Sequence, residues 1–163
     1  MDGGDGHFVA KFRRKDGPSY HGGYFSVKQE KNNNELKQAL ELYQSLCNTK
    51  ETPILFQAGN YVYYLPTEIP DFQGLHILRA GVQFGECKKN RMEPAHHFFM
   101  AAKPDTLRQL VSLETDDAAV LRYLKGEEIE CDPALKGYAG VCVDGVMLGF
   151  GKWQETRSVP STE

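Results

Sequence analysis

The stretch YAGVCVDGVMLGFGKW, residues 138–153, decides the fold of the C-terminal part of this chain. Apolar residues fill both of its halves, and Asp144-Gly145 stands between them. An Asp-Gly pair between two apolar runs is typical of a two-residue turn that joins antiparallel strands. The sequence therefore predicts a β-hairpin with strands at 138–143 and 146–153.

The end of this stretch, LGFGKW (148–153), also invites comparison with a phosphate-binding loop. Such a loop needs GxxxxGK followed by Ser or Thr and then a helix. Here Val146 stands in place of the first glycine, and Trp153 follows Lys152. We interpret the two glycines as marking a bulge or a close backbone contact within a strand, and Lys152 as a residue that could face a ligand.

Residues 32–65 predict a helix followed by another hairpin. NNNELKQALELYQSLC (32–47) places apolar residues at the i, i+3, i+4, i+7 spacing of an amphipathic helix, and Asn32 with Glu35 is a suitable start. The apolar runs Pro53–Gln57 and Tyr61–Leu65 then flank Ala58-Gly59-Asn60. Because Gly and Asn tolerate the positive φ of a tight turn, these runs predict a hairpin.

The segment PTEIPDFQG (66–74) has two prolines and a glycine, which makes it the expected domain boundary. Beyond it we expect a strand at 75–79, and an apolar stretch follows at 95–102. Pro104 is expected to open a short helix that carries Leu107, Leu110 and Val111. Thr115 is expected to cap another helix, DDAAVLRYLKG (116–126), with Gly126 as its C-terminal stop.

Composition limits the class of protein. The 163 residues suit one domain or two small packed ones, and the formal net charge is −3. No run approaches the ~18 apolar residues of a membrane helix, and no signal-peptide core is visible, so we expect a cytoplasmic protein. The four cysteines are scattered without a CxxC pair, which indicates reduced thiols.

The residues that could support catalysis or metal binding do not form a recognisable site. Glu93 with His96-His97 resembles a ligand cluster, but adjacent strand residues point to opposite faces, so we expect one histidine inside and one exposed. Cys87 precedes two lysines, yet no orienting histidine and acid lie at a known spacing. No βαβ unit with a glycine-rich turn is present for a nucleotide or S-adenosylmethionine.

A basic surface is the better-supported site. Residues 75–103 carry five basic groups and two acidic ones, a balance of +3, whereas residues 114–132 carry seven acidic and two basic groups, a balance of −5. Arg79, Lys88, Lys89 and Arg91 lie in or beside turns, where long side chains can reach phosphates, and His97 and Tyr123 could offer flat faces to an unpaired base. The alternative is a solvated turn with ordinary surface charges.

Three segments together resemble a known family. LHILRAGVQFGECKKNRMEPAHHFFMA (75–101), VLRYLKGEEIE (120–130) and KGYAGVCVDGVMLGFGK (136–152) are similar to the C-terminal region of Sun/RsmF-type ribosomal RNA 5-methylcytosine methyltransferases. The resemblance runs from residue 1 to about residue 153. Its motifs RAG, KxxRMEPAHH, YLKGE and DGxxLGFGK are short, and their order and spacing carry the specificity.

The resemblance implies an α+β fold in four parts. Residues 1–13 would be the last strand of the family's catalytic domain, 14–70 a small α/β linker subdomain, 71–153 a PUA-like mixed β-barrel with two short helices, and 154–163 a disordered tail. The family's cofactor loop and its two cysteines in Pro-Cys contexts are absent from this sequence. S-adenosylmethionine is therefore expected in the parent enzyme and not in this chain, and the expected partners are ribosomal RNA and that catalytic domain.

The resemblance leads to one leading interpretation and two rivals. The leading one is a non-catalytic, RNA-contacting module whose phosphate-facing residues are Arg79, Lys88, Lys89, Arg91 and Lys152, with His97 stacking on a base. The ending KWQETRSVPSTE lacks the family's basic terminal segment, which puts the RNA affinity in question. The rivals are a structural or protein-interaction domain and a small hydrolase or metal enzyme built on Glu93, His96 and Cys87.

Overall fold

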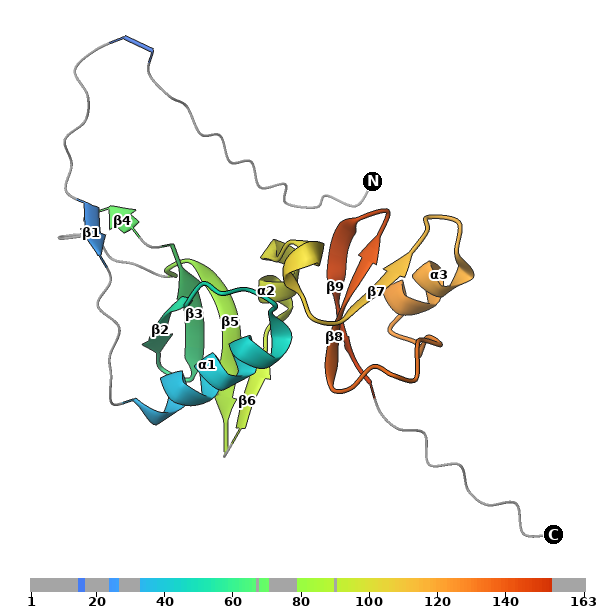
Figure 1. The fold of residues 1–163 in the computed structure, drawn as a ribbon, viewed down its shortest axis with the longest axis horizontal. Coiled ribbons are helices and arrows are strands. Elements are labelled where there is room, and N and C mark those ends of the chain that lie inside the picture. Colours follow the sequence, from blue (N-terminus) through green and yellow to red (C-terminus); the bar gives the residue numbers. More distant parts are fainter. Residues whose placement is uncertain are drawn as a thin grey trace, which may run out of the picture.

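A computed structural model describes residues 15–16, 24–26, 33–66, 68–70, 79–89 and 91–153. The predicted strand within residues 1–13, most of the strand at 75–79 and the tail 154–163 lie outside this part. In chain order (Figure 1), the elements are β1 (Tyr24–Ser26), α1 (Asn34–Leu46), β2 (Ile54–Ala58), β3 (Tyr61–Leu65), β4 (Glu68–Pro70), β5 (Val82–Lys88), β6 (Arg91–Pro94), α2 (His96–Ala101), the 3₁₀ helix η1 (Pro104–Thr106), β7 (Leu110–Leu113), α3 (Ala118–Leu124), β8 (Tyr138–Val143) and β9 (Val146–Lys152).

Helix α1 forms where the apolar spacing predicts it. Its buried residues are Leu36, Ala39, Tyr43 and Leu46, which recur on one face of the helix. The cap is Asn33 and not the expected Asn32, because the Asn33 side chain accepts a hydrogen bond from the Leu36 backbone N–H at 3.1 Å. The Asn33 amide also donates to the Gln57 side chain at 2.6 Å, which ties the start of α1 to β2.

Four antiparallel strands in the order β2-β3-β5-β6 form the sheet beneath α1. The β2–β3 hairpin is confirmed: Ala58 pairs with Tyr61 across a Gly59-Asn60 turn, and Gly59 has φ +59°. Strand β3 pairs with β5 in this same sheet, with Tyr61 opposite Glu86, so the sheet continues across the position of the domain boundary expected between residues 70 and 71. Strands β1 and β4 pair separately as a two-stranded antiparallel sheet.

Within the apolar run 95–102, His96–Ala101 forms helix α2, whereas the sequence predicted His96 and His97 as strand residues. Strand β6 ends at Pro94, and α2 begins at His96. Between them, Ala95 donates its backbone N–H to the Phe84 carbonyl of β5 at 2.8 Å. The helix is favoured because it lies between the two larger sheets and must contact both. Phe98 packs against Phe84 with ring centroids 4.9 Å apart, and Phe99 stacks on Phe150 at 4.5 Å.

The C-terminal part contains a three-stranded sheet in the order β7-β8-β9. The β8–β9 hairpin is confirmed, with Asp144 (φ +47°) and Gly145 (φ +79°) in its turn. The helix expected to carry Leu107, Leu110 and Val111 is wrong: only Pro104–Thr106 is helical, and Leu110–Leu113 is strand β7, which pairs in parallel with β8. Within the described residues this open sheet, covered by α2 and α3, does not close into the expected barrel.

Helix α3 occurs at the predicted place with a different cap. Asp117, and not Thr115, accepts the capping hydrogen bond, from the Ala119 N–H at 2.8 Å. Thr115 instead donates its hydroxyl to the Asp144 carboxylate in the β8–β9 turn. Gly126 ends the helical segment with φ +76°, as the sequence predicts.

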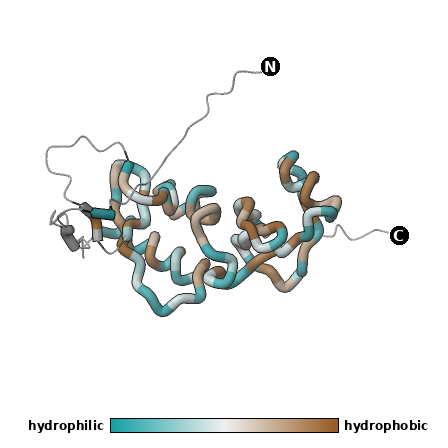
Figure 2. Tube along the Cα trace, turned by 90° about the horizontal axis from the view of Figure 1, so that it is seen from above, coloured by the Kyte–Doolittle hydropathy of each residue, from teal (hydrophilic) through white to brown (hydrophobic). Residues whose placement is uncertain are grey.

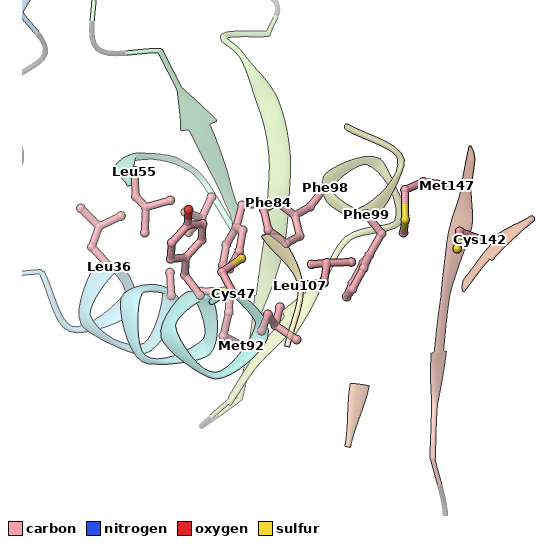
Figure 3. Close-up of a cluster of buried hydrophobic side chains, with 14 residues drawn as sticks. Leu36, Cys47, Leu55, Phe84, Met92, Phe98, Phe99, Leu107, Cys142 and Met147 are labelled. Carbon is pink, nitrogen blue, oxygen red and sulfur yellow. The ribbon is translucent and has the colours of Figure 1, made fainter. Parts of the chain in front are cut away.

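The hydrophobic core is continuous from α1 to β9. Figure 3 shows buried side chains running from Leu36 and Leu55, past Phe84, Phe98 and Phe99, to Met147 and Cys142. Figure 2 shows hydrophobic segments in both halves of the elongated molecule. Because α2 supplies the aromatic residues between the two larger sheets, it fixes how the β5–β6 hairpin and the β8–β9 hairpin lie relative to each other.

Candidate nucleic-acid interface

The tip of the β5–β6 hairpin carries three exposed cations, Lys88, Lys89 and Arg91, here called the basic hairpin. Lys88 and Arg91 are directly opposite in the register, and Lys89 lies in the turn between them. Exposed Lys and Arg side chains at a hairpin tip can reach phosphate oxygens without displacing core residues. Three of the predicted site residues are thus brought together by one hairpin.

Two carboxylates reduce the positive charge of the basic hairpin. Lys88 Nζ lies 2.6 Å from Glu86, and an Arg91 terminal nitrogen lies 2.6 Å from Glu93. The hydrogen bond to Glu86 raises the pKa of Lys88, which therefore stays charged. Lys89 has no ion pair within the described part of the chain, so it is the cation most available to an anionic ligand.

Lys152 approaches the same region from β9. It is directly opposite Tyr138 in the β8–β9 register, and its Nζ lies 5.6 Å from the centre of the Tyr138 ring. Burial raises the pKa of Tyr138, the Glu93 carboxylate adds to this effect, and Arg91 opposes it. Arg91 and Glu93 of β6 are therefore close enough to Tyr138 to influence its pKa, and Lys152 lies over the same ring.

The other two predicted site residues lie elsewhere. Arg79 precedes β5, whereas Lys88 ends it, and a strand of this length separates them by roughly 20 Å. His97 is exposed in the first turn of α2, outside the hairpin. The structure therefore holds Lys88, Lys89 and Arg91 on one hairpin and places Lys152 over Tyr138. Arg79 and His97 lie outside both places.

Tyr123 and His96 meet over Gly149, which changes the interpretation of both. The Tyr123 hydroxyl donates to the Phe150 carbonyl at 3.1 Å, and the ring is half-buried, so it is not free to stack on a base. The imidazole of His96 contacts the position that a Gly149 side chain would take. His96 and His97 are both exposed, whereas the sequence predicted one of them inside.

The residues of the hydrolase or metal-enzyme rival do not assemble into a site. Within the described ranges, no three His, Cys, Asp or Glu residues are grouped so that they could hold a metal ion. Burial raises the pKa of Cys87, and the carboxylates of Glu35 and Glu86 raise it further. An activated thiol needs the opposite shift, because the thiolate is the nucleophile. All four cysteines are free thiols, as predicted, and burial raises the pKa of Cys47 to about 11.

Sequence reasoning missed three aromatic residues: Tyr61, which is opposite Glu86 and next to Lys88, Phe56 on the same face of the sheet, and Tyr138. Phe56 and Tyr61 are 43% and 42% exposed, and the Tyr138 ring lies beneath Lys152. The signal that could have found the first two is the register of the predicted hairpin. With a two-residue turn at Gly59-Asn60, alternation puts Phe56 and Tyr61 on the face opposite Leu55 and Val62.

The surface around α3 differs from the basic hairpin in charge and in polarity. Leu121 and Leu124 are each 64% exposed and lie three residues apart on one face of the helix. The exposed acidic residues Glu114, Asp116, Asp117, Glu127, Glu128, Glu130 and Asp132 flank the helix in the sequence. This surface disfavours an anionic ligand and is the opposite of the basic hairpin.

Two family models match the chain. The first C-terminal domain of the RsmF rRNA methyltransferase matches residues 39–101, and the PUA domain of the methyltransferase RsmF matches residues 111–158. The first match continues across the expected boundary at residue 70 and ends with α2. This division agrees with the sheets, since β2, β3, β5 and β6 fall in the first match and β7, β8 and β9 lie at or beyond the start of the second. In the described part of the chain, no helix has the length and apolar character needed to cross a membrane.

Proposed function

Because this chain belongs to the C-terminal region of the RsmF-type ribosomal RNA methyltransferases, we propose that it is a non-catalytic module that contacts RNA and positions it for methyl transfer. The catalytic residues and the S-adenosylmethionine site are expected in a separate catalytic domain of the parent enzyme, and ribosomal RNA is the expected partner. The family descriptions support an accessory module of an rRNA methyltransferase. RNA contact through particular residues is our proposal.

The observation that carries the proposal is the basic hairpin, where one turn holds Lys88, Lys89 and Arg91 together. Lys152 adds a further cation over the ring of Tyr138, whose pKa Arg91 influences. These residues come from both matched domains, so an RNA strand that contacts all four would span the junction between the domains. Cations of this kind bind phosphates without regard to base identity, and each phosphate contact releases condensed counterions. The module would therefore supply affinity and orientation, and the choice of the methylated base would lie with the catalytic domain.

The experiment is a titration of labelled ribosomal RNA fragments at several salt concentrations. We expect the affinity of the unmodified chain to fall as the salt concentration rises. The logarithm of the binding constant should fall linearly with the logarithm of the salt concentration, with a slope of about −0.7 to −0.9 for each phosphate contact. Lys89→Ala removes the cation of the basic hairpin that has no ion pair within the described residues, and we expect it to weaken binding and lower the slope by about one contact. Lys125→Ala, which removes an exposed cation beside α3, is the matched control and should change neither quantity.

Binding that does not depend on salt, or equal effects of the two substitutions, would contradict the proposal. The second candidate, a protein-interaction module without RNA affinity, is favoured by the exposed Leu121 and Leu124 on α3. An exposed apolar pair bordered by acidic residues suits a basic protein surface. The same titration separates the two candidates, because the second requires no salt-dependent RNA binding at all.

A further inference from the structure

Two exposed aromatic side chains share one face of the four-stranded sheet. In the β2–β3 register, Ala58 is opposite Tyr61 and Phe56 is opposite Tyr63, so Phe56 and Tyr61 are diagonal neighbours on the same face. Leu55 and Val62 point the other way and are buried in the core under α1. The aromatic pair therefore lies on the face of the sheet that α1 does not cover.

The paired charges of the basic hairpin lie on this same face. Tyr61 is opposite Glu86, Glu86 is opposite Glu93, and Lys88 is opposite Arg91, so alternation places these side chains with Tyr61. Cys87 and Met92 lie on the other face, toward α1. Met92 is in the core, and the Glu35 carboxylate of α1 helps to raise the pKa of Cys87. Tyr61 is close enough to Lys88 to influence its pKa.

This arrangement joins flat rings with cations at one end of the sheet. Each ring is a little over 40% exposed, although most large aromatic side chains are highly buried. Unpaired bases stack on exposed aromatic side chains, and Lys or Arg beside them contacts the connecting phosphates. Duplex RNA keeps its bases stacked on one another, so it could use the cations of this surface but not its rings.

We propose that the face formed by Phe56, Tyr61, Lys88 and Arg91 binds unpaired nucleotides of RNA, with at least one base stacked on Tyr61. This inference rests on the proposed RNA contact and deepens it by naming single-stranded RNA as the ligand class. The choice of RNA over an apolar protein segment follows from charge complementarity, because Lys88 lies next to Tyr61 and the same hairpin carries Lys89 and Arg91. Glu86 and Glu93 hold Lys88 and Arg91 on this face through their ion pairs.

The test compares a labelled single-stranded oligoribonucleotide with the same strand annealed to its complement, by fluorescence anisotropy at fixed salt. We expect Tyr61→Ala to weaken binding of the single strand by about five- to a hundredfold, the range of a lost base stack, and to change duplex binding by less than about twofold. Tyr61→Phe keeps the ring and should bind as the unmodified chain does. Phe56→Ala should show the same preference as Tyr61→Ala, with a smaller loss.

Leu121→Ala is the matched control, since it removes an exposed apolar side chain from α3 and should leave both affinities unchanged. Salt-dependent binding that Tyr61→Ala does not weaken selectively would overturn this inference and leave the proposed function standing. No salt-dependent binding of either RNA by the unmodified chain would overturn both. An equal loss in Tyr61→Ala and Tyr61→Phe would also overturn stacking, because the ring would then be irrelevant.

Discussion

Gly149 is the residue at which β9, α2 and α3 come together. A Cβ atom there would contact the His96 imidazole and lie 2.6 Å from the Tyr123 hydroxyl, and the backbone has φ +149°. Glycine adopts this conformation easily, whereas residues with a side chain rarely do. The two glycines of LGFGK therefore differ. Gly149 lies in a crowded and strained position, whereas the Cβ position at Gly151 has no such neighbour within 4 Å.

We expect Gly149→Ala to lower the free energy of unfolding by about 1–3 kcal/mol, because the new methyl group must displace His96 or Tyr123 and the backbone is strained. Gly151→Ala, two residues along the same strand, should change it by less than about 0.5 kcal/mol. Urea denaturation followed by tryptophan fluorescence measures both variants. Equal destabilisation by the two substitutions would show that close packing at Gly149 is unimportant.

At the scale of single elements, the stability and the starting point of α1 depend on its N-cap residue, Asn33. The Asn33 side chain makes two contacts: it accepts a hydrogen bond from the Leu36 N–H, and its amide donates to Gln57 on β2. An N-cap side chain satisfies a backbone donor that the helix itself cannot satisfy. Asn33 therefore sets the start of the helix and also attaches this end to the sheet.

Asn33→Ala should lower the free energy of unfolding by about 1–2 kcal/mol, since the cap and the link to Gln57 are both lost. Asn34→Ala is the control, because Asn34 is exposed in the first turn and alanine has the higher helix propensity. We expect it to be neutral or slightly stabilising in the same chemical denaturation measurement. If Asn34→Ala destabilised as much as Asn33→Ala, the cap would be assigned to the wrong asparagine.

The elements that the sequence predicts correctly are those determined by local chemistry. Gly59-Asn60 and Asp144-Gly145 specify two hairpins because few residues accept positive φ, and the apolar spacing of residues 36–46 specifies α1. Helix α2 and strand β7 depend on their surroundings instead. Phe98 and Phe99 are adjacent and both buried, which requires two partners on different sides, and no local pattern shows where those partners lie.

The same distinction applies to the candidate interface. Lys88, Lys89 and Arg91 could be grouped from the sequence because one turn holds them. The position of Lys152 over the ring of Tyr138, whose pKa Arg91 and Glu93 influence, depends instead on the assembled fold. Arg79 looked equivalent in the sequence, but a complete strand separates it from Lys88.

At the scale of the whole molecule, contacts on two sides join the first matched domain to the C-terminal part of the chain. On one side, Phe99 stacks on Phe150 and carries the core from α2 into β9. On the other, the end of α1 is tied to the segment before β7: Arg108 donates its backbone N–H to Leu46 at 2.8 Å and its Nε to Gln44 at 2.9 Å. Next to these contacts, Cys47 and Leu107 form an isolated β-bridge.

A core shared in this way should make the two domains unfold as one unit. We expect far-UV circular dichroism, to which α1 contributes most among the helices, and fluorescence of Trp153, the only tryptophan, to give one coincident urea transition. Trp153 follows β9 and donates its backbone N–H to Gly137 at 2.7 Å, so it reports on the three-stranded sheet. Two separated transitions would mean that the domains are independent.

Phe99→Ala tests which side chain couples them. Phe99 is 1% exposed, and its loss should lower the free energy of unfolding by about 3–5 kcal/mol while moving both signals together. Met100→Ala, its neighbour in α2 with 47% exposure, should move neither by more than about 0.5 kcal/mol. Phe99→Leu retains most of the apolar volume and gives a smaller shift in the same direction, so the comparison holds even if the alanine variant does not fold. If only the Trp153 signal moved, Phe99 would stabilise the second domain alone. The coupling between the two domains would then have to come from the contacts of Arg108 with the end of α1.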